Sequence, residues 1–299
     1  MLRDIQQAAC AERFHRRGTE RQKRLSSLSS LMSGAPVDPS AIEPVARQQE
    51  RARLLAQASP VPPPTDLRDG RRILEAVVGR DDRLPRSFLP LGSRTADAVC
   101  RVATFTDMGE LSLGTGFAVA RGLILTNNHV LPNHTAAARG QVEFGFWSSA
   151  LDAQHSRLAL ALDPDRFFLT DVRLDFTLVS LERRASDVAH EIFGAIDLLP
   201  QSGKALVGEA VNVIQHGGGG AQTVSLRDNV VVDVFDDWIH YTSDTDEGAS
   251  GAPVLNDQWQ LAALHHAAFE YPAANGSRIV VNEGARISSI TSALARLLS

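Results

Sequence analysis

From about residue 97 onward, apolar residues gather in short runs separated by Gly, Asn and Asp. About a dozen such runs, with no regular helix between them, predict an all-β core built as a sandwich or barrel. The 97–285 region is long enough to favour two small barrels over one. The predicted strands are Ala98–Phe105, Gly116–Ala120, Leu123–Thr126, Gln141–Trp147, Phe176–Leu181, Ala210–Gln215, Thr223–Leu226, Val230–Phe235, Pro253–Leu255, Leu261–His266 and Arg278–Val281.

The two ends of the chain have helical patterns instead. Residues 1–59 are polar, with an apolar stripe too thin to form a core, so this helical extension must pack on another part or stay mobile. Asp38 provides an N-cap there, and Ser40 and Glu43 have the spacing of a capping box. Residues 60–96 predict a proline-rich linker and a short helix, and residues 286–298 an amphipathic helix that closes the 97–299 domain.

Charge and composition narrow the function. The 299 residues carry a net charge of −5, divided into +4 over residues 1–59 and −9 over the rest. An acidic main domain disfavours nonspecific nucleic-acid binding, and no apolar stretch is long enough to span a membrane. Only Cys10 and Cys100 are present, which favours a reducing, cytoplasmic location. No motif predicts a cofactor, and no Cys/His spacing predicts a metal site.

Three segments have the composition of a hydrolytic site. An apolar strand ends at His129, and Asp175 is an acid at the start of a second apolar strand. Ser250 lies in a glycine-flanked turn just before a third strand. A serine hydroxyl becomes nucleophilic when an imidazole accepts its proton, and a buried carboxylate fixes the tautomer of that imidazole. Backbone amides of Gly248 and Ser250 could form the oxyanion hole. Asp171 is a rival for the acid, with capping of the preceding turn as its other role.

These three segments resemble the catalytic blocks of trypsin-like, chymotrypsin-fold serine peptidases, particularly intracellular bacterial trypsin-like peptidase domains. The resemblance covers about residues 97–290 and rests on the runs 125–130 (LTNNHV), 175–179 (DFTLV) and 248–253 (GASGAP). It implies two six-stranded antiparallel β-barrels, about 97–195 and 196–285, with the site between them. It also implies that His129 is general base and then acid, Asp175 its orienter and Ser250 the nucleophile.

The sequence departs from the family before the serine. Ala249 stands where secreted trypsins have the aspartate that binds the new N-terminal amine, so that activation device is absent. Two residues predict opposite substrate preferences. Asp244, followed by Thr245, lies six positions before Ser250, where trypsin has the acid that selects basic side chains. His265 has the position of the histidine that selects acidic side chains in glutamyl endopeptidases.

The resulting prediction is a serine endopeptidase acting on a protein or peptide substrate. The helical extension, residues 1–59, is expected to regulate it or to recruit a regulatory protein. Two alternatives stay open: a catalytically silent peptide-binding module on the same scaffold, and an esterase that uses the same three residues.

Overall fold

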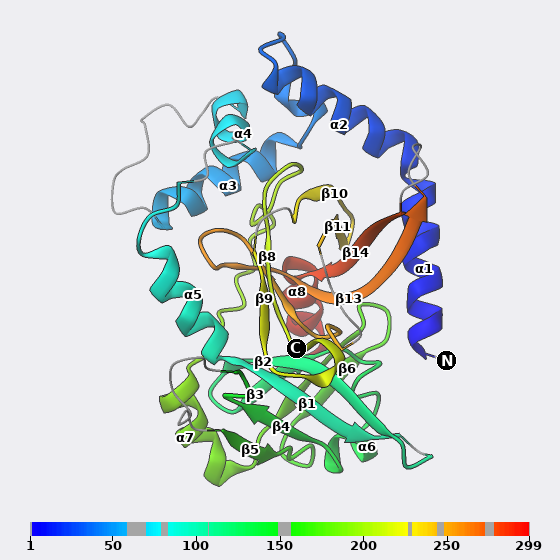
Figure 1. Ribbon diagram of the computed structural model, residues 1–299, viewed down its shortest axis with the longest axis vertical. Coiled ribbons are helices and arrows are strands. Elements are labelled where there is room, and N and C mark those ends of the chain that lie inside the picture. The colour runs from blue at the N-terminus through cyan, green and yellow to red at the C-terminus, as the bar shows by residue number, and fades with distance from the viewer. Residues whose placement is uncertain are drawn as a thin grey trace.

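The computed structural model describes residues 2–58, 70–78, 83–106, 108–148, 157–226, 229–243, 248–272 and 278–298. Its core consists of two antiparallel sheets of seven strands each, one above the other in Figure 1. The first sheet has the order β5-β4-β1-β2-β3-β7-β6 and the second β10-β11-β14-β13-β12-β8-β9. The first contains β1 (Val99–Phe105), β2 (Leu111–Ala120), β3 (Leu123–Thr126), β4 (Gln141–Phe144), β5 (Leu158–Ala161), β6 (Phe168–Asp171) and β7 (Phe176–Ser180). The second contains β8 (Asn212–Gln215), β9 (Thr223–Ser225), β10 (Val231–Phe235), β11 (Trp238–Tyr241), β12 (Pro253–Leu255), β13 (Leu261–Pro272) and β14 (Arg278–Arg286).

Each sheet curls back on itself through a single bridge. Leu162, just after β5, pairs with Leu181, just after β7, and Ala210 before β8 pairs with Val230 before β10. These bridges join strands from opposite sides of each sheet, as barrel closure requires. The expected two-barrel architecture is therefore confirmed, with seven strands in each sheet instead of six.

Two helices contradict the expectation that no regular helix lies between the strands. The short α6 (His134–Ala138) lies between β3 and β4, and α7 (Arg183–Phe193) connects β7 to β8. Ala189 and Phe193, four residues apart on one face, are buried against the first sheet, where the Phe193 ring stacks on Phe144 with 4.8 Å between centroids. The other helices are α1 (Leu2–Arg16), α2 (Gly18–Met32), α3 (Val45–Ala58), α4 (Gly70–Val78), α5 (Phe88–Asp97) and α8 (Ile287–Leu297), with short 3-10 turns η1 (Pro39–Ala41) and η2 (Gly217–Gly219).

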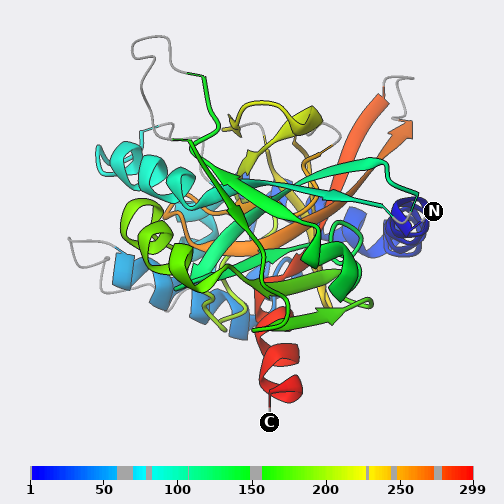
Figure 2. The same ribbon diagram turned by 90° about the horizontal axis from the view of Figure 1, so that it is seen from below.

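The C-terminal helix α8 belongs to the core between the sheets, as its pattern predicts. Ile287 and Ile290 are fully buried in a cluster that also holds Phe117 of the first sheet and Leu264 of the second. In Figure 2, α8 projects from the body and ends at the C-terminus. The two sheets and α8 therefore share one continuous core.

The helical extension and the following helix α4 obtain their core from the second sheet. Leu31, Ile42 and Leu74 are at most 1% exposed and cluster with Val213 and Ile239 of that sheet. In Figure 1, α2, α3 and α4 lie across the end of the second sheet, and α1 runs down its side next to β13. The thin apolar stripe is sufficient because the sheet provides the other half of the interface.

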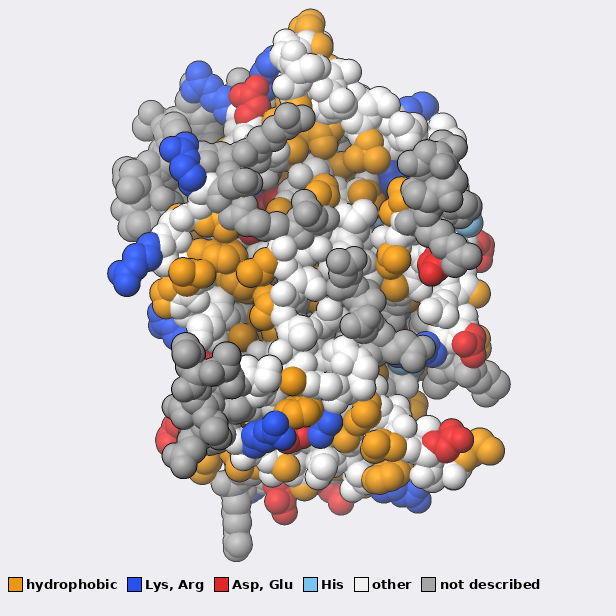
Figure 3. Space-filling model, viewed as in Figure 1, with side chains coloured by type: hydrophobic (Ala, Val, Ile, Leu, Met, Phe, Trp, Pro, Cys, Tyr) orange, Lys and Arg blue, Asp and Glu red, His pale blue; other side chains and the backbone are white. Residues whose placement is uncertain are grey.

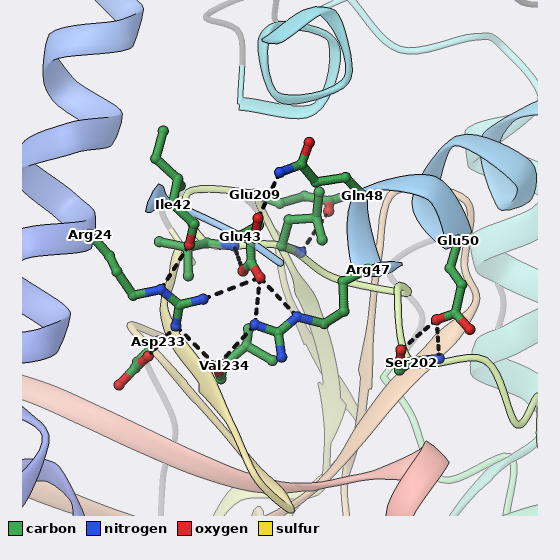
Figure 4. Close-up of polar contacts among 12 residues, drawn as sticks. Arg24, Ile42, Glu43, Arg47, Gln48, Glu50, Ser202, Glu209, Asp233 and Val234 are labelled. Carbon is green, nitrogen blue, oxygen red and sulfur yellow. Dashed lines mark hydrogen bonds and ion pairs between the residues drawn. The ribbon is translucent and has the colours of Figure 1, made fainter. Parts of the chain in front are cut away.

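Buried charges fix this interface. Glu43 accepts hydrogen bonds from Arg24, at 3.2 Å, and from Arg47, at 2.8 and 2.5 Å, and its other oxygen accepts the backbone N–H of Val207 at 2.9 Å (Figure 4). The predicted capping box at Ser40 and Glu43 is therefore wrong: Glu43 holds the extension to the second sheet. Asp38 does cap η1, where its carboxylate accepts from the Ser40 N–H.

α5 covers the core with one face only. Its Phe88 carbonyl accepts from the Trp259 indole N–H at 2.9 Å, and Gly92 leaves room for the same ring. Leu89 is 71% exposed and Leu91 40%, and apolar side chains gather at this level of the face shown in Figure 3. Within the described part of the chain, no helix has the length and apolar character needed to cross a membrane.

Candidate functional site

His129 and Asp175 meet at the open end of the first sheet. His129 follows β3, and Asp175 lies in the turn between β6 and β7 in a left-handed conformation, with φ of +52°. The Asp175 Oδ2 lies 2.7 Å from His129 Nδ1, and Oδ1 accepts the backbone N–H of His129 at 3.0 Å. The rival acid Asp171 instead accepts the Leu174 N–H at 2.9 Å, which caps the turn.

The environment of Asp175 keeps its carboxylate ionised. Its side chain is fully buried, and burial alone would raise the pKa, but hydrogen bonds from His129 and His266 outweigh burial and lower the pKa to about 2. Asn127 donates from Nδ2 to the Asp175 carbonyl at 2.8 Å, which holds the turn. His129 Nε2 is buried and has no hydrogen-bond partner among the described residues, so the imidazole nitrogen opposite the carboxylate is free to accept a proton.

Ser250 lies in a turn that only glycines allow. Gly248 and Gly251 have φ of +99° and +87°. A Cβ on Gly251 would lie 1.9 Å from the Thr115 carbonyl oxygen, and one on Gly248 would lie 2.7 Å from the His216 carbonyl oxygen. The turn is therefore pressed against β2 on one side and against the glycine run after β8 on the other.

Thr115 ties this turn to the first sheet. Its N–H donates to the Ser250 carbonyl at 2.8 Å, and its Oγ1 donates to the Gly248 carbonyl at 2.8 Å. The same hydroxyl accepts the His216 N–H at 3.0 Å. A Cβ on the neighbouring Gly114 would lie 2.9 Å from Val130, next to His129, and 3.2 Å from the Ser250 carbonyl. The structure thus brings the serine turn and the His129 segment to the same place on β2.

Two parts of the predicted site have no internal partner. The backbone amides of Gly248 and Ser250 donate to no acceptor within the described part of the chain. No hydrogen bond joins Ser250 Oγ to His129 Nε2, a contact that often tightens only when substrate is bound. The expected oxyanion donors are therefore not used to hold the turn.

A cavity of about 330 Å³ adjoins Ser250. One wall is β13, from His265 to Glu270, and the other includes Arg3 and Gln7 of α1. The Gln7 side-chain amide donates to the Ala268 carbonyl of β13 at 3.2 Å. Nothing in the sequence pattern predicted that α1 would form part of this pocket.

Of the predicted pocket residues, His265 lines the cavity, whereas Asp244 and Thr245 lie outside the described residues. His265 Nδ1 is 2.6 Å from the Tyr241 hydroxyl. Burial, followed by the nearby charge of His266, lowers the pKa of His265 to about 3. His265 therefore offers the pocket an uncharged imidazole at neutral pH.

The sequence analysis missed a buried ionic network behind Asp175. His266 Nδ1 lies 3.2 Å from Asp175 Oδ2, and His266 Nε2 lies 2.7 Å from Glu283 Oε1. Glu283 is also bound by His240 Nε2, at 2.7 Å, and by the Arg13 guanidinium of α1. The His265–His266 pair on a buried strand was the one sequence signal that could have pointed here.

A metal ion does not fit this network. Cys10, His240 and Glu283 place one ligand atom each within 4.8 Å of one another. However, both Glu283 oxygens already accept hydrogen bonds from Arg13, His240 and His266. Burial raises the pKa of the Cys10 thiol, so the thiolate that a metal requires is disfavoured.

Comparisons with known proteins identify the family and the fold. The chain is 35% identical over 207 residues to the uncharacterized protein y4fB of Sinorhizobium fredii, an alignment that covers 65% of this chain and 31% of that protein. The chain thus spans less than a third of this relative's length. The structure of Deg5 shares the fold, with a TM-score of 0.51 and 18% identity over 70% of this chain and 94% of Deg5. The active form of the Rv3671c protease from M. tuberculosis aligns with a TM-score of 0.47 and 17% identity, over 69% of this chain and 83% of that one. The sequence model of the trypsin-like peptidase domain matches residues 114–264, about half of the chain, and the chain belongs to that family.

Proposed function

We propose that the chain is a serine endopeptidase that hydrolyses peptide bonds through an acyl-enzyme on Ser250. The observation that carries this proposal is the His129–Asp175 pair: a buried, ionised carboxylate 2.7 Å from Nδ1, with Nε2 left free. With both acceptor oxygens of Asp175 directed at His129, the neutral imidazole carries its proton on Nδ1 and presents a lone pair on Nε2.

The first step forms the acyl-enzyme. His129 Nε2 takes the hydroxyl proton as Ser250 Oγ attacks the scissile carbonyl carbon, and a tetrahedral oxyanion forms. The unused amides of Gly248 and Ser250 donate to that oxyanion. As the intermediate collapses, His129 returns the proton to the leaving amine, and the acyl group stays on Ser250.

The second step releases the acid. Water attacks the acyl carbon while His129 Nε2 accepts its proton, and the proton then returns to Ser250 Oγ. Asp175 stays ionised throughout and stabilises the imidazolium in both steps.

The arrangement of the serine turn supports the oxyanion hole. Thr115 binds the carbonyls of Gly248 and Ser250, which holds the turn without using the amides of those residues. Ala249 is 1% exposed in the place of the trypsin aspartate, so the turn is held by Thr115 without an ion pair to a new N-terminus.

We propose further that residues 1–59 regulate this site, directly or through a partner protein that binds them. The position of Arg3 and Gln7 in the cavity wall supports this proposal. For the compartment we propose the cytoplasm, supported by two free and buried cysteines, Cys10 and Cys100.

Fluorophosphonate labelling tests the proposed nucleophile. The reagent forms an Oγ–P bond and releases fluoride only at an activated serine. We expect the wild type to label, Ser250→Ala not to label, and Asp175→Asn to label roughly 10³- to 10⁴-fold more slowly. Ser243→Ala, a buried serine of the same segment, is the matched control and should label like the wild type.

Two results would contradict the proposal. Equal labelling of the Ser250→Ala variant would show that another group is the nucleophile. A folded wild type that does not label, yet binds peptides, would favour the silent peptide-binding module.

A further inference from the structure

We propose that helix α1 is a working part of the active site, because Arg13, Glu283 and His266 form an ion-pair chain that positions Asp175. The inference rests on the proposed function, in which Asp175 orients His129. Arg13 and Glu283 do not line the cavity beside Ser250, and both ring nitrogens of His266 are bound to carboxylates, so the three act as positioning residues.

The ion-pair chain is continuous and almost completely buried. Arg13 Nε donates to Glu283 Oε2 at 2.9 Å, and Arg13 Nη2 binds the other carboxylate oxygen. Glu283 Oε1 lies 2.7 Å from His266 Nε2, and His266 Nδ1 lies 3.2 Å from the Asp175 oxygen that also binds His129. The side chains of Glu283, His266 and Asp175 are 0% exposed, and that of Arg13 is 17% exposed.

The contacts of His266 define its charge. Each ring nitrogen faces a carboxylate oxygen, and an ionised carboxylate can only accept, so both nitrogens must donate. His266 is therefore an imidazolium. Burial lowers its pKa, but the hydrogen bonds to Asp175 and Glu283 outweigh burial and raise it above the ordinary value. The cations Arg13 and His266 then alternate with the anions Glu283 and Asp175, which balances the buried charge.

The ring of His266 packs against an aromatic side chain on its way to Arg13. Its ring lies 4.7 Å from that of Trp238, over which the Arg13 guanidinium also stacks at 4.1 Å. The titratable groups around it, on α1, β11, β13, β14 and the strand ends, are Arg3, Cys10, Arg13, His129, Asp175, His240, Tyr241, His265, Glu270 and Glu283. His240 binds Glu283 through Nε2, and its Nδ1 has no partner among the described residues.

Removal of Arg13 affects Asp175 through this chain. Glu283 stays ionised through its two histidine contacts but loses the guanidinium that fixes its position, so His266 loses its fixed partner. The Asp175 oxygen shared by His266 and His129 then has less defined geometry. Loss of a positive charge near Asp175 also favours a proton on His129, so the acid limb of the rate profile should move to higher pH.

α1 also offers a matched control for docking. Arg17, one turn further on, binds buried Asp233 at 2.6 Å, a carboxylate that Arg24 also binds at 2.8 Å and that has no contact with the chain to Asp175. Arg16 is exposed and makes no ion pair within the described residues. Arg17→Gln should therefore weaken α1 docking without changing the site, and Arg16→Gln should do neither.

The experiment measures the fluorophosphonate labelling rate from pH 5 to 9 and the Tm for Arg13→Gln, Arg13→Lys, Arg16→Gln and Arg17→Gln in the full chain. We expect Arg13→Gln to label about tenfold more slowly at neutral pH, with its acid limb about half a pH unit higher. Arg13→Lys should keep the wild-type limb because it keeps the charge. Arg17→Gln should lower the Tm and leave the limb unchanged. His266→Gln should raise the limb by about one pH unit, since the cation lies next to Asp175; if it fails to fold, the Arg13 series decides alone.

Two results would overturn the inference: an Arg13→Gln limb and rate equal to wild type, or an equal limb shift in Arg17→Gln. Failure of the proposed function is distinguishable because wild type itself would not label. In that case the His129 imidazole is titrated by NMR in the Ser250→Ala background. If the ion-pair chain positions Asp175, the titration midpoint of His129 should be higher with Arg13→Gln than without it. An unchanged midpoint would refute the inference.

Discussion

Thr115→Val tests the proposed anchoring of the serine turn. Valine has nearly the shape of threonine, so the substitution removes the hydroxyl and little else. That hydroxyl is fully buried, donates to the Gly248 carbonyl and accepts the His216 N–H. Both backbone groups would lose their partner in a place that water does not reach.

The size of the effect follows from these two groups. A buried polar group without a partner costs about 1–3 kcal/mol, so Thr115→Val should lower the free energy of unfolding by about 2–6 kcal/mol. The share that falls on the Gly248 carbonyl, about 1–3 kcal/mol, acts on the turn that presents Ser250. At about 1.4 kcal/mol per factor of ten, this lowers the fluorophosphonate labelling rate by roughly 5- to 150-fold.

Thr104→Val is the matched control for Thr115→Val. Thr104 is 2% exposed, lies on β1 of the same sheet and donates to the Ala136 carbonyl at 2.6 Å, away from the serine turn. It should cost about 1–3 kcal/mol of stability and leave labelling unchanged. Urea unfolding gives the stabilities, and labelling is measured at a temperature where both variants are folded. The anchoring role would be refuted if Thr115→Val labelled at the wild-type rate. It would also be refuted if Thr104→Val lost as much labelling rate as Thr115→Val.

Three further predictions follow from the fold and the site. Gly251→Ala should abolish fluorophosphonate labelling, because its Cβ would lie 1.9 Å from a backbone oxygen; a labelled variant would show that the turn can shift without loss. Leu74→Ala should lower the free energy of unfolding in urea by about 2–5 kcal/mol, whereas exposed Leu89→Ala should change it by less than about 0.5 kcal/mol. Equal small losses would mean that α4 does not share the core of the second sheet. Thermal scans over pH should show stability lost in acid as Asp175 takes up a proton, because its folded pKa of about 2 is below its unfolded value. Stability should be lost again as the pH rises through the folded pKa of His266, which is raised above its ordinary value. A Tm unchanged on both sides would contradict the charged network.

Local sequence patterns predicted the strands that carry the site. β3 and β12 have the expected bounds because glycine or proline marks one end and an uninterrupted apolar run fills the strand. β6 (Phe168–Asp171) was missed because all four of its residues are only partly buried, so it has neither alternation nor an apolar run. α7 was missed although Ala189 and Phe193 have helical spacing, because the region was interpreted as all-β.

Long-range contacts could not be predicted from local patterns. Arg13 and Glu283 are 270 residues apart, and nothing near either residue in the sequence indicates the pairing. Glu43 had a plausible local role, as a capping residue, that a buried partnership with Arg24 and Arg47 overrides. The candidate triad was predictable because each member lies in a distinctive local segment, whereas the support behind Asp175 depends on how the extension docks.

The most direct test of the central claim is peptide-bond cleavage by the full chain. A mixed peptide library is incubated with wild type and with Ser250→Ala, and new termini are identified by mass spectrometry. The account predicts new termini with wild type only, together with an acyl adduct on Ser250 when the reaction is quenched in acid. Equal cleavage by both proteins would contradict the account, and so would a wild type that labels with fluorophosphonate and hydrolyses esters but cleaves no peptide.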